Sequence, residues 1–167
     1  MPPKGPVDPL EKKFIYMKCV GGEIAAAAAL APRCAPVGLA PKKVGEDIQK
    51  ATKDWRGIKV YVEIMVQNRV ATVTIVPTAA PLIIKALKEP PRDRKKEKNR
   101  VHNGKLSLEQ VIGIAKEMRP RSMAQSLQGT VLEVLGTMIS VGCLMDGKHP
   151  RDVQKQIRKG ELPIPEE

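Results

Sequence analysis

The stretch from Gln125 to Gly142 constrains the fold most, because it reads as one long helix with two unlike faces. One face is apolar at helical spacing and carries Leu127, Val131, Val134, Leu135, Met138 and Val141. The other face is small and nearly uncharged and carries Gly129, Thr130, Gly136, Thr137 and Ser140. A solvated helix face is normally filled with Lys, Glu and Gln, and an interior glycine costs about 1 kcal/mol relative to alanine. Two explanations stay open here: tight packing of another helix, or close approach of a large flat partner.

The charge balance favours an anionic partner. Lys and Arg together number 29 against 18 acidic residues, so the formal net charge is +11. Nucleic acid is the first candidate partner for such a chain, and an acidic membrane surface is the second. The most basic part is the 81–120 segment, whereas residues 121–167 carry as many acids as bases. The long helix therefore begins just after the segment that would attract an anion.

The sequence contains no pattern that indicates a reaction. Its 3 cysteines are widely spaced, which predicts buried thiols of an intracellular protein and no disulfide framework or zinc site. His102 and His149 each stand apart from other metal ligands and are expected to be solvated or to cap a helix. Neither a phosphate-binding glycine loop nor a nucleophile elbow occurs. We expect no enzyme activity, no metal, no cofactor and no small-molecule substrate.

No membrane partner is expected either. No apolar run reaches the ~18 residues that a membrane span needs, and the N-terminus lacks the apolar region of a signal peptide. The sequence therefore predicts a soluble protein that is not secreted.

Residues 1–76 are expected to form a small α+β domain behind a Pro-rich arm at residues 1–12. The clearest strand signal is the alternation of Ile58, Val60, Val62, Ile64 and Val66. The predicted fold is a three-stranded antiparallel sheet under two helices. The strands are expected at 14–20, 58–66 and 70–76, and the helices at 24–30 and 42–52, the second with Val44, Ile48 and Ala51 facing inwards.

The segment from Ala31 to Pro41 is rich in proline. Its restricted φ angles predict a stiff loop without regular structure through most of its length. Pro41 fits the first position of the following helix. The loop is interpreted either as a rigid connector or as a preformed recognition edge, since a stiff exposed loop binds without a large ordering cost.

A second domain, residues 82–167, is expected to be helical and is separated from the first by a linker at 77–81. Residues 92–100 are too charged to fold alone and are either a solvated loop or an arm that contacts phosphates. Ser107 and Gln110 form a capping box that opens a helix ending near Arg119. Ser122 and Gln125 repeat that pattern ahead of the long helix, and a last helix is expected at 150–159. Two helices joined by a short basic turn have a helix-turn-helix outline.

An RNA that is read by its shape fits these features best. The chain has only 1 Phe, 1 Trp and 2 Tyr, too few for the stacking platforms of sheet-based single-strand readers. A helix face of Gly, Thr and Ser can lie close to a shallow minor groove, while neighbouring basic residues contact phosphates. The alternative is a helix-turn-helix DNA-binding regulator. It would need Arg, Asn or Gln on its recognition helix, where only Gln128 is available.

The chain resembles a known family, large-subunit ribosomal protein eleven, whose eukaryotic form is called protein twelve. The resemblance covers nearly the whole chain. It is carried by four stretches, residues 31–48, 82–96, 135–143 and 146–150. It implies a structural constituent of the large ribosomal subunit. Its C-terminal domain would bind the rRNA of the GTPase-associated centre at the base of the stalk. Its N-terminal domain would face acidic stalk proteins and, transiently, translation elongation factors.

The resemblance and the basic segments together give the predicted site residues. Those for rRNA are Arg92, Arg94, Lys95, Lys96, Lys98, Arg119, Arg121, Ser122, Gly129, Thr130, Gly136, Thr137, Ser140 and Gly142. Those that would face factors and stalk proteins are Pro32, Pro36, Gly38 and Pro41. The implied location is the cytoplasmic ribosome, with assembly in the nucleus or nucleolus.

Overall fold

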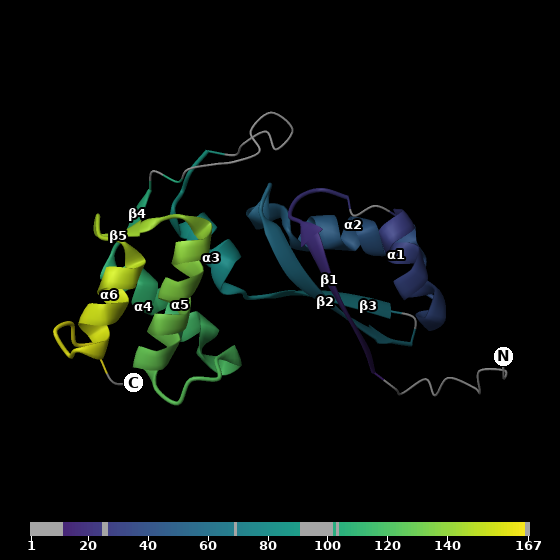
Figure 1. The fold of residues 1–167 in the computed structure, drawn as a ribbon. Helices are drawn as coiled ribbons and strands as arrows, with labels where there is room; N and C mark the ends of the chain where they lie inside the picture. Colours follow the sequence, from purple (N-terminus) through teal and green to yellow (C-terminus); the bar gives the residue numbers. More distant parts are fainter. Residues whose placement is uncertain (1–11, 25–26, 69, 91–101, 103, 166–167) are drawn as a thin grey trace. The chain divides into compact units, whose positions relative to one another are not determined.

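The computed structural model describes residues 12–24, 27–68, 70–90, 102 and 104–165. The chain divides into two units, Met1–Val76 and Pro77–Glu167 (Figure 1). The elements of unit 1 are β1 (Lys13–Val20), α1 (Ala27–Cys34), η1 (Ala35–Val37), α2 (Pro41–Ala51), η2 (Lys53–Trp55), β2 (Lys59–Gln67) and β3 (Val70–Val76). Those of unit 2 are α3 (Ala79–Ala86), β4 (Lys105–Leu106), α4 (Leu108–Met118), η3 (Arg119–Arg121), α5 (Leu127–Val141), β5 (Leu144–Met145) and α6 (Pro150–Arg158).

The predicted α+β fold of unit 1 is confirmed. Its sheet has the order β1-β2-β3 with both neighbouring pairs antiparallel. The alternation along β2 places Val60, Val62, Ile64 and Val66 in the core, because every second side chain of a strand points to the same face. Helices α1 and α2 cover that face with Leu30, Cys34, Val44 and Ile48 (Figure 1). The hydrophobic core of unit 1 therefore lies between the sheet and these two helices.

The prediction for the Pro-rich segment is wrong in part. Helix α1 continues through Pro32 to Cys34, and Pro36 lies in the short 3-10 helix η1. Leu30 and Cys34 are four residues apart and both fully buried, so they hold this last turn against the core despite the proline. Pro32 is exposed, and so is the helix surface one turn before it, which lets water satisfy the carbonyl that a proline cannot bond. Tertiary packing thus outweighs the local restriction.

Helix α2 starts at Pro41 as predicted, but its C-terminal end differs in one position. Ala51 is exposed, and Thr52 is buried instead. The Thr52 hydroxyl donates to the carbonyl of Ile48 at 2.7 Å and accepts from the backbone N–H of Gly22 at 3.1 Å. Because both roles of the hydroxyl are used, this buried polar group is satisfied.

Unit 2 is mainly helical, and two of its details differ from the expectation. The short helix expected at 82–88 is present as α3, but it begins earlier, at Ala79, and buries Pro81 within the segment expected to be a linker. The two-residue strands β4 and β5 pair in parallel and join residues nearly forty positions apart. Strands this short carry no periodic signal, so they arise from packing of the surrounding helices.

The predicted capping box of α4 is confirmed, since the Ser107 and Gln110 side chains each bond the other's backbone N–H. The predicted start of the long helix is two residues too early. Helix α5 begins at Leu127, and its N-cap is Ser126, whose hydroxyl accepts from Gly129 N–H. Its end at Gly142 agrees with the prediction.

The two histidines have different surroundings. His149 caps α6 as expected, with its Nδ1 accepting from the backbone N–H of Arg151. His102 does not cap a helix, and its Nδ1 lies 2.7 Å from a carboxylate oxygen of Glu89. The described residues contain no group of three or more His, Cys, Asp or Glu arranged to hold a metal ion. Among the helices of those residues, none has both the length and the apolar composition that crossing a membrane requires.

Candidate nucleic-acid interface

Helix α5 divides into a buried face and an exposed face. The buried face consists of Leu127, Thr130, Val131, Val134, Leu135 and Met138. On the other side Gly136 and Ser140 are exposed, and Thr137 is half-buried. The Thr137 and Ser140 hydroxyls donate to carbonyls one turn earlier, those of Glu133 and Thr137 respectively. Each hydroxyl uses its donor in this bond and can still accept a hydrogen bond, so the strip formed by Gly136, Thr137 and Ser140 offers acceptors close to the helix backbone.

The three glycines of this region have three different roles. A Cβ atom on Gly129 would lie 2.7 Å from the Cβ of Ala124, so this glycine is needed for internal packing. Gly142 has a φ of +85° and ends the helix in the left-handed conformation that favours glycine. A Cβ on Gly136 would find only the Nε2 of Gln154, at an ordinary 3.7 Å. Of these three glycines, only Gly136 has no reason in the fold of unit 2 for its missing side chain, a property that it shares with the exposed Gly113 of α4.

Thr130 lies in the core of unit 2 and not on the exposed face of α5, where the sequence analysis placed it. It is fully buried, and its hydroxyl lies 3.0 Å from Ser122 Oγ, to which it donates. Ser122 in turn donates to Glu133 at 2.7 Å and accepts from the backbone N–H of Ala124. The Ser122 hydroxyl therefore links the loop before α5 to the first turns of that helix.

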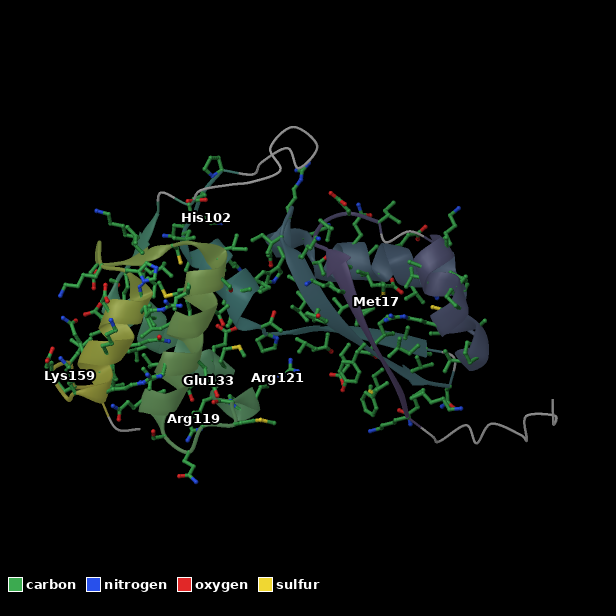
Figure 2. The ribbon with its side chains drawn as sticks, in the orientation of Figure 1. Met17, His102, Arg119, Arg121, Glu133 and Lys159 are labelled. Carbon is green, nitrogen blue, oxygen red and sulfur yellow. The ribbon has the colours of Figure 1, made fainter. Side chains whose placement is uncertain are left out.

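Arg119 fixes the same loop from its other side. Its guanidinium donates to the carbonyls of Ala124 and Gln125 at 2.7 and 2.8 Å, and a planar fork suits such paired bonds. Arg121 donates to the carbonyl of Pro77 at 3.3 Å and is exposed. Figure 2 shows Arg119 and Arg121 near the start of α5. Of the two predicted arginine contacts, Arg119 is engaged in shaping the loop, and Arg121 is the more available.

The sequence analysis missed Met123, which lies in the loop between η3 and α5 that Ser122 and Arg119 hold in place. Its side chain is 97% exposed, although bonds to Ser122, Ala124 and Gln125 hold the backbone on either side of it. The pattern around it matched a helix cap, which hid the residue among expected capping positions.

Helix α6 packs along one side of α5 through two glutamine bonds. Gln154 Nε2 donates to the carbonyl of Leu132 at 3.0 Å, and Gln128 Nε2 donates to that of Ile157 at 3.3 Å. Gln128 was the only base-reading candidate of a DNA-binding helix, and its amide is used inside the unit. The DNA-regulator alternative loses its one supporting side chain.

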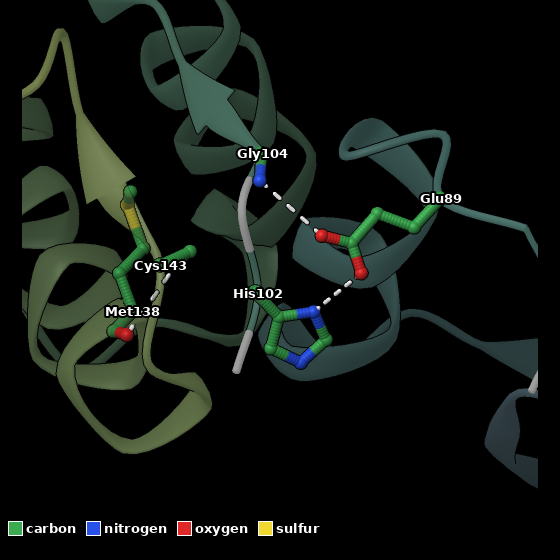
Figure 3. A network of polar contacts seen from close by, with 5 residues as sticks. All are labelled: Glu89, His102, Gly104, Met138 and Cys143. Carbon is green, nitrogen blue, oxygen red and sulfur yellow. Dashed lines mark hydrogen bonds and ion pairs between the residues drawn. The ribbon is translucent and has the colours of Figure 1, made fainter. Parts of the chain in front are cut away.

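Glu89 precedes the basic run at 92–100, and its carboxylate contacts two residues that follow this run. One carboxylate oxygen accepts from the backbone N–H of Gly104 at 3.3 Å, and the other lies 2.7 Å from His102 Nδ1 (Figure 3). The Glu89 and His102 side chains are each only 14% exposed, so this contact is partly shielded from water. The predicted contacts Arg92, Arg94, Lys95, Lys96 and Lys98 lie outside the described residues.

The residues expected to face factors lie on the surface of unit 1. Pro32, Pro36 and Gly38 are exposed, and Pro41 is half-buried. Gly38 has a φ of +69°, and a Cβ added to it would have no atom within 4 Å, so its glycine identity serves the turn. The structure brings these residues together along α1, η1 and the start of α2.

Comparison with protein families defines the class. Residues 75–144 match the RNA-binding domain of ribosomal protein L11, and residues 15–71 match its N-terminal domain. The chain is therefore a ribosomal protein with an RNA-binding domain, and α4, η3 and α5 lie inside the match to that domain.

Similarity to individual proteins extends over the full length. The chain is 59% identical to large ribosomal subunit protein uL11 of Caenorhabditis elegans over 165 residues, which is 99% of each chain. It is 58% identical to uL11A of Schizosaccharomyces pombe over 167 residues and to uL11x of Arabidopsis thaliana over 168 residues, with both chains of each pair fully covered. The chain belongs to the ribosomal protein L11 family, which confirms the family predicted from its motifs.

Proposed function

We propose that this protein is a structural constituent of the large ribosomal subunit and that its unit 2 binds the rRNA of the GTPase-associated centre at the base of the stalk. One observation carries the RNA-binding surface: Gly136 is exposed on α5 and is not required by the packing of unit 2. A glycine that lowers helix stability without an internal reason is explained by a partner that touches the backbone.

The chemistry of this strip suits RNA. Ser140 follows Gly136 by four residues and Thr137 by three, so its hydroxyl neighbours both positions on the surface of α5. RNA minor grooves display 2′-hydroxyl groups, which donate and accept hydrogen bonds. Short side chains let the helix backbone approach such a groove, whereas a Lys or Glu at position 136 would hold it away. Arg121 and the basic run at 92–100 would then contact phosphates and supply most of the affinity.

Unit 1 is proposed to face acidic stalk proteins and, transiently, translation elongation factors. Its exposed Pro32, Pro36 and Gly38 lie beside Lys42 and Lys43, which are exposed in the first turn of α2. A preformed edge bordered by two lysines suits a partner with acidic side chains. We place the protein on cytoplasmic ribosomes, with assembly in the nucleus or nucleolus, and without a catalytic step or a cofactor.

Binding to a folded rRNA fragment tests the function of unit 2. The full chain should bind a transcript of the GTPase-associated centre at moderate salt and should bind duplex DNA of equal length much more weakly. It should also co-sediment with large ribosomal subunits. Equal affinity for the two nucleic acids would show a general polyanion binder and would contradict the proposal.

A pull-down tests unit 1 separately. Acidic stalk proteins should be retained by the wild-type chain and less by a variant with Lys42→Gln and Lys43→Gln, while both chains bind the rRNA fragment equally. Equal retention of stalk proteins by the two chains would contradict the role of this edge.

A further inference from the structure

Helix α6 lies beyond the residues that match the RNA-binding domain, since that match ends at residue 144 and α6 begins at Pro150. It nevertheless borders the strip around Gly136. Gln154 of α6 donates to the carbonyl of Leu132, and its Nε2 lies 3.7 Å from a Cβ position built on Gly136. One face of α6 therefore runs directly beside the exposed face of α5.

Two arginines share that face with Gln154. Arg151 precedes Gln154 by three residues and Arg158 follows it by four, and helical residues with these spacings are neighbours on one side. The acidic residue of α6, Asp152, precedes Gln154 by two positions, so it lies on a different side. The side of α6 that borders α5 is thus basic, and Asp152 lies on a different side of the helix.

The charged residues of α6 differ in whether they are already engaged. Lys155 lies 3.5 Å from Asp152, and Lys159, just after the helix, lies 3.8 Å from Glu161. Arg151 and Arg158 are both exposed. Within the part of the chain that the structure describes, neither guanidinium has a hydrogen-bond or ion-pair partner. Both arginines beside the Gly136 strip therefore remain available to a ligand.

We propose that Arg151 and Arg158 bind phosphates of the RNA that lies on the Gly136 strip, so that α6 forms a second wall of the interface. This inference rests on the proposed rRNA binding of unit 2. At 1.5 Å per residue the two positions are about 10 Å apart along the helix axis, far enough to contact separate phosphates. A guanidinium group can donate two parallel hydrogen bonds to a phosphate. Its five N–H donors are held in one plane, whereas the three donors of a lysine ammonium rotate on a flexible side chain.

The salt dependence of RNA binding tests the proposal. In the full chain, Arg151→Gln with Arg158→Gln should flatten the slope of log K against log salt by about 1.4 to 1.8, at ~0.7 to ~0.9 per phosphate contact. A control variant, Lys50→Gln with Lys116→Gln, removes the same charge from exposed positions of α2 and α4 and should leave the slope nearly unchanged. Arg151→Lys with Arg158→Lys should keep most of the slope and lose part of the affinity.

The outcomes separate this inference from the function on which it rests. If the wild-type chain fails to bind the rRNA fragment, the proposed function itself is wrong. If the wild type binds and the glutamine variant has the same slope and affinity, α6 makes no phosphate contact and only the inference fails. A loss in both double glutamine variants would show a general charge effect and would also overturn it. Thermal unfolding of each variant shows whether the fold is retained.

Discussion

A Cβ atom on Gly129 would lie 2.7 Å from the Cβ of Ala124, whereas one on Gly136 would lie 3.7 Å from its nearest neighbour, Gln154 Nε2. The two glycines occupy the same helix and look alike in the sequence. Their surroundings predict opposite effects of the same substitution on stability.

Gly129→Ala should destabilise the protein. The added methyl group would meet a Cβ that is fixed to the backbone of the loop, so the loop or the helix must move. Overpacking of this kind typically costs about 1–3 kcal/mol, which exceeds the ~1 kcal/mol gained from helix propensity. Urea unfolding should show a lower midpoint with an unchanged slope. A midpoint equal to or above that of the wild type would show that the loop moves aside freely.

Gly136→Ala should stabilise the protein by about 0.5–1 kcal/mol, because the helix gains propensity without a clash. Gly136→Leu should leave unit 2 folded and weaken binding of the rRNA fragment, since its side chain would project from the exposed face. Fluorescence anisotropy with labelled RNA measures the affinity, and circular dichroism checks the fold. Wild-type affinity in the leucine variant would mean that RNA does not approach this strip.

Arg119→Lys should weaken the loop before α5 while keeping its charge. A lysine cannot bond the carbonyls of Ala124 and Gln125 with a planar fork. Backbone amides of residues 122–126 should exchange faster with deuterium than in the wild type, and RNA affinity should fall with an unchanged salt slope. A fall in the slope by a full contact would instead make Arg119 a direct phosphate ligand.

Replacing Arg94, Lys95 and Lys96 with glutamine should flatten the salt dependence of rRNA binding by up to about 2 in the log–log slope, at ~0.7 per contact. This prediction comes from the sequence, because these residues lie outside the described part of the chain. Titrations from low to moderate salt measure the slope. An unchanged slope would identify the basic run as a solvated segment.

The three cysteines should react slowly in the folded protein. Burial raises the pKa of the Cys19 and Cys34 thiols. Burial also raises the pKa of the Cys143 thiol. The charge of Glu89 raises it further by a smaller amount, and a backbone hydrogen bond lowers it.

Because the folded pKa values are raised, the unfolded state loses thiol protons first as pH rises, and the free energy of unfolding should decline above about pH 8.5. Iodoacetamide labelling with and without urea measures the protection. Equal rates in both conditions would contradict it.

The strands and capped helices could be predicted from the sequence because their signals are local. The alternation along β2 and the Ser107–Gln110 capping box each specify a structure within a few residues. The family motifs are also local, and they identified the class of protein. The apolar stripe of α5 identified its buried face, because a helix of that length cannot expose so many aliphatic side chains.

The rest depended on distant partners. The burial of Leu30 and Cys34 carries α1 past Pro32, and nothing near Pro32 in the sequence signals it. The sequence placed Thr130 on the small face, but this residue is fully buried and its hydroxyl donates to Ser122, eight positions earlier. The role of Arg151 and Arg158 depends on how α6 lies along α5, which the spacing of charges on one helix does not indicate.

The contacts of Glu89 with His102 and Gly104 also fix where the basic run is attached. They bring described residues from before and after that run together, so both attachments lie at one place on unit 2. The Glu89 and His102 side chains are each only 14% exposed, which partly shields their contact from competition by water. One carboxylate therefore sets the point on unit 2 from which the protein's most basic segment departs.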